Sequence, residues 1–438
     1  MADLSVNFAG IKSPNPFWVA SGPPANSAHQ AHRAFEAGWG GVVWKTIGDP
    51  IVNVSSRYSA LNDGPSRMIG FNNIELISDR SAETNFREIA EVKKRWPNHA
   101  VIASLMVDTR ERWHEFVRRS RDCGADGIEL NFGCPHGMCE RGMGSAVGQN
   151  PKVIETIVGW VMEAAEIPVI VKLTPNVTDI GVSARAAARA GADAISLINT
   201  INSITNVNLD TFVPEPNVGG KSSHGGYCGP AVKPIALNML QVCASDPEVG
   251  IPICGIGGIG TWRDAAEFIA LGASSLQVCT AIMHYGFRIV EDMTDGLSAY
   301  LDSKGFKSLD DLCGKAVPNL QKWETLDLGY QRVARINYDH CIGCNLCYIA
   351  CEDGAHQCID LVPPDSLGIG LGPGRIPGKP VPKVREEDCV GCNLCSLVCP
   401  ADNCITMTTV DSGRPSFTWS DYQAKLARGE VEPLPPHP

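Results

Sequence analysis

The sequence has no excess of basic residues. Its 37 Lys and Arg are outnumbered by 48 Asp and Glu, which gives a formal net charge of -11 at pH 7. Nucleic acids and anionic membranes bind basic faces, so the composition argues against both as partners. Long hydrophobic runs are also missing, since no stretch approaches the ~20 apolar residues of a spanning helix. Residues 1–17 lack a basic region followed by an apolar run, so we expect a cytoplasmic protein.

Cysteine is abundant, and its placement is informative. Ten of the 18 cysteines lie between Cys341 and Cys404. Eight of them form two Cys-x-x-Cys-x-x-Cys-x-x-x-Cys motifs, whose spacing is typical of a pair of [4Fe-4S] clusters in a bacterial ferredoxin-like domain. In such domains the fourth cysteine of each motif ligates the other cluster. The predicted ligand sets are Cys341, Cys344, Cys347 and Cys399 for one cluster, and Cys389, Cys392, Cys395 and Cys351 for the other.

Two other metal interpretations remain open at this stage. A pair of zinc sites would also use Cys-x-x-Cys steps, but zinc needs four ligands per ion and no third step. Cys358 and Cys404 follow the two motifs and are expected to be buried thiols. Replacement of a cluster ligand by one of them is the alternative.

The first 300 residues alternate short apolar runs with amphipathic stretches. Eight such repeats with near-continuous apolar strands predict an α/β fold, a (β/α)8 TIM barrel, with an open doubly wound sheet as the alternative. The eight predicted strands are residues 16–22, 40–46, 100–106, 126–133, 168–174, 194–200, 251–258 and 275–282.

Polar side chains lie at the carboxyl ends of these strands, where barrel active sites form. Lys45 and Lys172 stand inside apolar runs. A buried lysine is costly unless it meets an anion or an electron-rich acceptor, and a reduced flavin is one. Either lysine alone could instead extend to the surface.

A glycine-rich turn, Gly255–Gly260, superficially matches G-x-G-x-x-G. The acidic residue of a dinucleotide site is missing about 20 residues on, so the turn fits the phosphate of FMN better. A plain tight turn is the alternative.

The loop after the fourth strand exposes Cys134, our first candidate for a proton donor, with Cys139 and His136 as weaker ones. Alternatively, Cys134 could be a small buried apolar residue with no role in catalysis, as isolated cysteines often are.

The predicted organisation has four segments. An FMN-binding catalytic barrel covers residues 1–305, a connecting segment 306–334, the ferredoxin-like domain 335–411 and a C-terminal tail 412–438. The tail ends in EPLPPHP and is expected to be extended.

Several motifs together resemble the dihydropyrimidine dehydrogenase family and, more distantly, dihydroorotate dehydrogenase. They are NPFWVASG, VVWKTIG, FNNIELIS, ELNFGCPHGMCERGMG, VKLTPNVTDI, GGYCGPAVKPIAL and both cysteine motifs. The resemblance implies that Cys134 protonates C5 of a pyrimidine while flavin N5 delivers hydride to C6. It implies substrate contacts at Asn73, Asn131, Phe132, Gly133, Asn199 and Thr200. It implies FMN contacts at Ser21, Lys45, Thr46, Lys172, Gly229, Ile256, Gly257, Gly258, Cys279 and Thr280.

The implied activity is NAD(P)H-linked, reversible reduction of uracil or thymine. Electrons would pass through both clusters from a partner subunit that binds FAD and NAD(H) or NADP(H) and carries its own iron-sulfur motifs, in a heterotetramer. Two alternatives stay open: a dihydroorotate dehydrogenase-like enzyme acting on another cyclic C=C bond, and a non-catalytic electron-transfer subunit.

Overall fold

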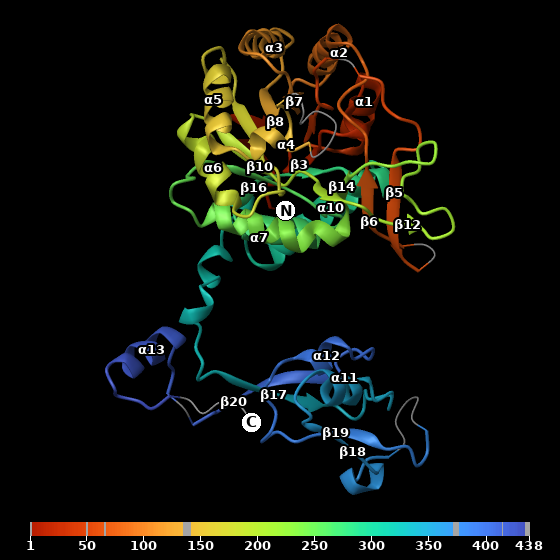
Figure 1. The fold of residues 1–438 in the computed structure, drawn as a ribbon, viewed down its shortest axis with the longest axis vertical. Helices are drawn as coiled ribbons and strands as arrows, with labels where there is room; N and C mark the ends of the chain where they lie inside the picture. Colours follow the sequence, from red (N-terminus) through yellow and green to blue (C-terminus); the bar gives the residue numbers. More distant parts are fainter. Residues whose placement is uncertain are drawn as a thin grey trace. The chain divides into compact units, whose positions relative to one another are not determined.

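The computed structural model describes residues 2–49, 51–64, 67–134, 142–370, 376–413 and 415–433. The chain forms two compact units, Met1–Leu320 and Gln321–Pro438 (Figure 1). Their boundary falls inside the segment that the sequence assigns to the connection. No helix in the described part of the chain is both long and apolar enough to cross a membrane.

The first unit contains a closed barrel of eight parallel strands, which confirms the predicted fold class. Each predicted run contains or overlaps one strand. In barrel order the strands are β3 (Phe17–Val19), β4 (Gly41–Val43), β7 (Ala100–Leu105), β8 (Gly127–Asn131), β9 (Val169–Lys172), β10 (Ala194–Leu197), β15 (Ile253–Ile256) and β16 (Ala273–Val278).

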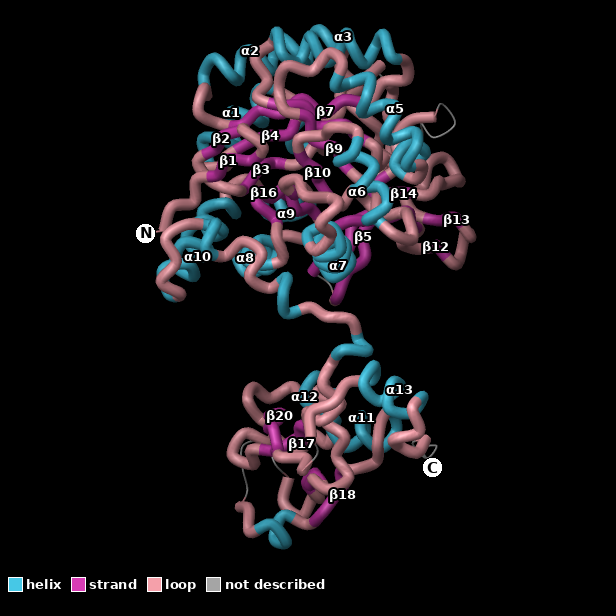
Figure 2. The backbone as a smooth tube through the Cα atoms, turned by 90° about the vertical axis from the view of Figure 1, so that its left-hand side faces the viewer, coloured by secondary structure: helices cyan, strands magenta, loops and turns pink. Residues whose placement is uncertain are grey.

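Amphipathic helices surround the barrel and bury their apolar faces against the strands (Figure 2). In α3, for example, Trp113, Phe116 and Val117 are buried, and Thr109 caps the first turn. The outer helices are α1 (Ala28–Ala37), α2 (Ala82–Arg95), α3 (Arg110–Asp122), α5 (Pro151–Met162), α6 (Ile180–Arg189), α7 (Lys233–Ala244), α8 (Trp262–Ala270) and α10 (Ile289–Ser303), with the short α4 (Ser145–Gly148) and α9 (Thr280–Tyr285) between them.

The amino end of the barrel is closed by a hairpin of β1 (Val6–Phe8) and β2 (Ile11–Ser13). Phe8 and Ile11 from this hairpin pack with Trp18, Ile102 and Ile170 of the barrel in one buried apolar cluster. This plug leaves the carboxyl end as the open end of the barrel.

A four-stranded antiparallel sheet, which the sequence did not predict, lies beside the open end. Its order is β11 (Ile201–Ser203), β14 (Gly225–Cys228), β6 (Arg67–Asn73) and β5 (Tyr58–Asp63). Figure 1 shows β5, β6 and β14 side by side at one edge of the barrel unit. Between β11 and β14, the chain also forms a two-stranded hairpin of β12 (Val207–Asn208) and β13 (Val213–Pro214).

The second unit has two antiparallel strand pairs and two helices that begin inside the cysteine motifs. β17 (Gln331–Ile336) pairs with β20 (Ile405–Val410), β18 (Ile359–Val362) pairs with β19 (Val381–Val384), and the helices are α11 (Leu346–Gly354) and α12 (Leu394–Leu397). The prediction of an extended tail is wrong for Trp419–Ala427, which form α13, and residues 434–438 lie outside the described residues. A capping box between Thr418 and Asp421 begins this helix.

Candidate active site and cluster sites

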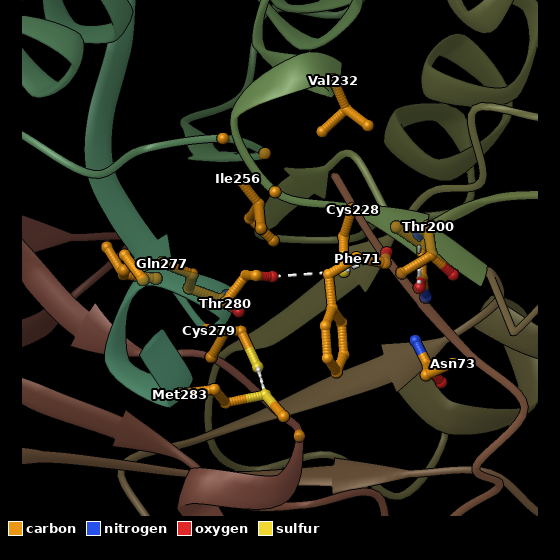
Figure 3. A pocket seen from close by; sticks show the side chains of 18 of the residues that line it. Phe71, Asn73, Thr200, Cys228, Val232, Ile256, Gln277, Cys279, Thr280 and Met283 are labelled. Atoms are coloured by element: carbon orange, nitrogen blue, oxygen red, sulfur yellow. Dashed lines mark hydrogen bonds between the residues drawn. The ribbon is translucent and has the colours of Figure 1, made fainter. Parts of the chain in front are cut away.

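A cavity of about 430 Å³ opens at the carboxyl ends of the barrel strands. All ten predicted FMN contacts line it, together with Cys134, Asn73, Asn131, Asn199 and Thr200. Figure 3 shows Gln277 and Cys279 on the left, Asn73 of β6 on the right and Phe71 of β6 between them; all four line this cavity. The barrel mouth and the antiparallel sheet therefore build one site between them.

Phe132 and Gly133 do not line the cavity. The Phe132 side chain is buried in the core, where its ring packs edge to face on Trp113 at a centroid distance of 6.3 Å. Gly133 lies against Asn199, and a Cβ at this position would come within 2.3 Å of the Asn199 Cβ. Gly133 thus gives Asn199 room, and Phe132 anchors the strand end.

Three asparagine amides face the cavity in fixed orientations. Asn199 Nδ2 donates to Asn131 Oδ1 at 3.0 Å, and Asn131 Nδ2 donates to Thr46 Oγ1 at 2.9 Å. Asn73 Nδ2 donates to the Gly226 carbonyl at 3.0 Å. Asn131 Oδ1 is fully used, because it also accepts the Gly133 N–H at 3.2 Å. Each Nδ2 keeps one N–H, and the Asn73 and Asn199 oxygens keep acceptor capacity, so the array suits a ring with alternating carbonyl and N–H groups.

Both predicted lysines lie inside the barrel mouth and are only 4% and 5% exposed. Lys45 Nζ forms an ion pair with Glu75 at 2.5 Å. Lys172 Nζ is 3.4 Å from both Gln277 Oε1 and Glu129 Oε1. These contacts are long for an ammonium group, so Lys172 keeps N–H capacity for an electron-rich group in the cavity.

Glu129 is a buried acidic residue near the cavity that was not among the predicted site residues. It lies on β8, two residues before Asn131, and is completely buried. Its Oε2 accepts hydrogen bonds from Ser196 Oγ at 2.9 Å and Gln277 Nε2 at 2.7 Å. Oε1 has no hydrogen-bond partner in the described part of the chain, although the Lys172 ammonium lies within ion-pair range. The available signal was an acidic residue placed between the apolar residues Ile128 and Leu130.

Glu75 is a second acidic residue that was missed. It lines the cavity, and its side chain is 7% exposed. Its carboxylate accepts from Lys45, from Arg57 at 3.3 Å and from the Tyr58 hydroxyl. Burial, with a further effect of Glu75, raises the pKa of Tyr58. The position of Glu75, two residues after Asn73, adds a carboxylate acceptor to the amide array.

Cys134 lies three residues after the end of β8 and is nearly buried at the cavity wall. Its carbonyl accepts the Ser145 N–H at 2.9 Å. Gly144 adopts a φ of 61° here, and a Cβ at Gly144 would lie 2.7 Å from the Cys134 carbonyl oxygen. The close turn therefore fixes the backbone of Cys134. The weaker candidates His136 and Cys139 lie outside the described residues.

Two other thiols line the cavity, Cys228 and Cys279. The Thr280 hydroxyl donates to Cys228 Sγ at 3.1 Å, and Cys279 Sγ lies 4.0 Å from Met283 Sδ (Figure 3). Burial raises the pKa of Cys228 to about 11 and that of Cys279 to about 12. Both groups are therefore neutral thiols at physiological pH.

The predicted glycine turn lies between β15 and α8. Gly257 and Gly258 have φ values of 125° and 77°. Glycine adopts this left-handed backbone conformation without strain. The turn leaves main-chain N–H groups at the cavity wall, where a phosphate would fit. Gly258 is also closely packed, since a Cβ there would lie 2.7 Å from the Lys233 Cβ.

We expect Gly258→Ala to weaken FMN binding at least about tenfold, because strained backbone costs about 1–3 kcal/mol and the new methyl displaces Lys233. Gly260→Ala is the matched control, since its added Cβ would have no atom nearer than 3.9 Å. Fluorescence titration of the flavin-free proteins measures both affinities. Equal affinities in the two variants would contradict a role for this turn in phosphate binding.

The cysteine motifs line two separate hollows in the second unit. The residues of each hollow come from both motifs, as crossed ligation requires. One hollow is lined by Cys341, Cys344, Cys347 and Cys399 with Cys404, and the other by Cys389, Cys392, Cys395 and Cys351 with Cys358. Among the described residues, no three His, Cys, Asp or Glu side chains converge on one point as ligands of a single ion do. A cubane holds its thiolates farther apart than a single ion does.

Double variants test the crossed arrangement. We expect Cys341→Ala with Cys399→Ala to lose about half of the bound iron, because both changes affect one cluster. Cys341→Ala with Cys351→Ala is expected to lose nearly all of it, because each change affects a different cluster. Iron and sulfide analysis of the purified proteins distinguishes the two cases, and uncrossed ligation predicts the opposite pattern.

Two family models match the chain. The dihydroorotate dehydrogenase model matches residues 3–301, and the 4Fe-4S dicluster domain model matches residues 334–407. The "NAD-dependent dihydropyrimidine dehydrogenase subunit PreA" of Escherichia coli K12 is 47% identical over 360 residues, which are 82% of this chain and 87% of the relative. The chloroplastic dihydropyrimidine dehydrogenase (NADP(+)) of Arabidopsis thaliana is 40% identical over 72% of this chain and 77% of its own.

A dihydroorotate dehydrogenase is also similar. The catalytic subunit of dihydroorotate dehydrogenase B (NAD(+)) of Pyrococcus abyssi is 38% identical over 72% of this chain and 99% of its own. The first family model spans all eight barrel strands, and the second spans all eight motif cysteines. The resemblance predicted from the motifs is confirmed: the chain belongs to the dihydroorotate dehydrogenase family of oxidoreductases, groups with its dihydropyrimidine dehydrogenases, and carries a 4Fe-4S dicluster domain.

Proposed function

We propose that the chain is the catalytic subunit of a dihydropyrimidine dehydrogenase that reduces the C5=C6 bond of uracil or thymine, reversibly. The observation that carries this proposal is the convergence of three asparagine amides, two buried lysines and the Cys134 thiol on one cavity of about 430 Å³. The name of the E. coli relative, a dihydropyrimidine dehydrogenase subunit, supports it.

The cavity residues fit FMN. The turn at Gly257 and Gly258 offers main-chain N–H groups for a phosphate, and Lys172 has N–H capacity for the electron-rich part of the ring. FMN bound there supplies the hydride that pyrimidine C6 receives. The residues that would hold it are Ser21, Lys45, Thr46, Lys172, Gly229, Ile256, Gly257, Gly258, Cys279 and Thr280.

The chain's own residues orient the pyrimidine and move the proton. Asn73, Asn131, Asn199 and Thr200 hold the ring edge, and Glu75 accepts from a ring N–H. Cys134 donates its S–H proton to C5, so the product gains one hydrogen at each carbon of the former double bond. The Cys134 thiolate is then reprotonated from solvent. Fixed amides lower the entropic part of the barrier because the ring arrives already oriented.

The two cysteine hollows fit [4Fe-4S] clusters, each of which passes one electron at a time. The electrons come from a partner subunit that binds FAD, oxidises NADH or NADPH and has iron-sulfur motifs of its own, in a heterotetramer. The word "subunit" in the name of the E. coli relative supports a partner chain.

The proposal is tested with the purified chain and reduced methyl viologen as electron donor. After correction for the clusters we expect a flavin absorbance band at about 450 nm. We expect turnover with uracil and thymine, and none with orotate or maleimide. Turnover with orotate and none with uracil would replace this function by the dihydroorotate dehydrogenase-like one. A protein without flavin would instead be an electron-transfer subunit.

A further inference from the structure

Each cluster hollow contains one more cysteine than a cubane needs. Cys358 lines the hollow of Cys351 and Cys389, and Cys404 lines that of Cys341 and Cys399. Both are buried, at 4% and 3% exposure.

The two extra thiols occupy equivalent positions in the two halves of the unit. Each stands directly before an isoleucine that begins a strand, Ile359 of β18 and Ile405 of β20. Each interacts with the fourth cysteine of the preceding motif and the first cysteine of the other. The placement therefore follows the internal repeat of the unit.

Cys358 makes two contacts with one ligand sulfur. Its Sγ lies 3.5 Å from Cys351 Sγ, and its backbone N–H donates to the same sulfur at 3.4 Å. In the described part of the chain, the thiol of Cys358 has only cysteine sulfurs as hydrogen-bond partners. Once Cys351 and Cys389 bind iron as thiolates, the S–H of Cys358 can point only at them.

Cys404 differs in having an oxygen acceptor. Its Sγ lies 3.8 Å from the Asn337 carbonyl oxygen, and the Asn337 N–H donates to the Cys404 carbonyl at 2.7 Å. Its S–H therefore divides between this backbone oxygen and the sulfurs of Cys399 and Cys341. Both thiols therefore contact ligand sulfurs, but only the Cys404 thiol also has a backbone oxygen as an acceptor among the described residues.

We propose that Cys358 is a positioning residue that donates its S–H to the Cys351 thiolate and raises the reduction potential of that cluster above that of the other. The proposal rests on the crossed ligation given above. A donor to a ligand thiolate stabilises the reduced cluster most, because the added electron increases the negative charge on the sulfurs. When the two clusters differ in reduction potential, a single added electron resides mainly on the cluster with the higher potential.

The test uses the full chain and four single variants. Cys358→Ala and Cys358→Val both remove the donor, and the bulkier valine keeps water out of the vacated space. Cys358→Ser keeps a donor, and Cys404→Ala is the matched control from the other half. Iron and sulfide contents are measured first, and EPR-monitored redox titration then gives both cluster potentials.

We expect all four variants to keep the iron content of the parent. In Cys358→Ala and Cys358→Val the equilibrium constant for reducing one cluster should fall about tenfold, equal to about 59 mV for one electron. Cys358→Ser should recover most of this shift, and Cys404→Ala should show a smaller one. Unchanged potentials in both donor-free variants would overturn the proposal. Loss of about half the iron in Cys358→Ala would also overturn it, and would make Cys358 a ligand in place of Cys351.

Discussion

Replacing Cys134 with alanine is expected to lower the rate of pyrimidine reduction by about 10²- to 10⁴-fold, the usual contribution of a general acid. The thiol lies at the cavity wall at the end of β8, and its backbone is held by the Ser145 N–H. Alanine keeps these backbone contacts, so FMN and iron contents should not change. Stopped-flow mixing of the prereduced protein with uracil isolates the affected step.

Cys228→Ala is the matched control for this experiment. Cys228 also lines the cavity, but burial raises its pKa to about 11, and its thiol already contacts Thr280 and the Phe71 carbonyl. We expect the control to keep most of the parent rate. Normal reduction by Cys134→Ala would remove the proposed proton donor, whereas equal losses in both variants would indicate a general disturbance of the cavity.

The barrel could be predicted from the sequence because parallel strands are buried on both faces and stand out as apolar runs. The antiparallel sheet could not. β14 and β11 are short, β5 is largely exposed, and β6 pairs with β14, which is more than 150 residues away in the chain. Such pairing leaves no local periodicity in the sequence.

Only some residues of the candidate site could be predicted from the sequence, for a similar reason. Asn131 ends β8, and Asn199 and Thr200 closely follow β10, so their convergence at the open end follows from the fold. Glu75 and Glu129 could not be placed, because an acidic residue usually lies on the surface and only tertiary structure gives it a buried partner. Gln277 was missed too, although it contacts both Lys172 and Glu129.

Replacing Glu129 with alanine is expected to lower the free energy of unfolding by about 3–5 kcal/mol, the usual cost of removing one partner of a buried ion pair. Lys172, which is 5% exposed, would lose its ion-pair partner, and Ser196 and Gln277 would lose their common acceptor. Urea denaturation of the flavin-free protein measures the loss. Glu129→Gln, which keeps an acceptor and the side-chain volume, should lose less.

The cause of this loss is isolated by adding Lys172→Met to Glu129→Ala. The double variant removes the buried cation together with its partner, so we expect it to be more stable than Glu129→Ala alone, because the unpaired charge is the main penalty. Glu166→Gln is the surface control, since the Glu166 side chain is 65% exposed and pairs with Arg121. Its denaturation midpoint should match that of the parent. If Glu129→Ala is as stable as the parent, the pairing of Glu129 with Lys172 is contradicted. If the double variant is no more stable than Glu129→Ala, the loss of stability comes from the Ser196 and Gln277 hydrogen bonds instead.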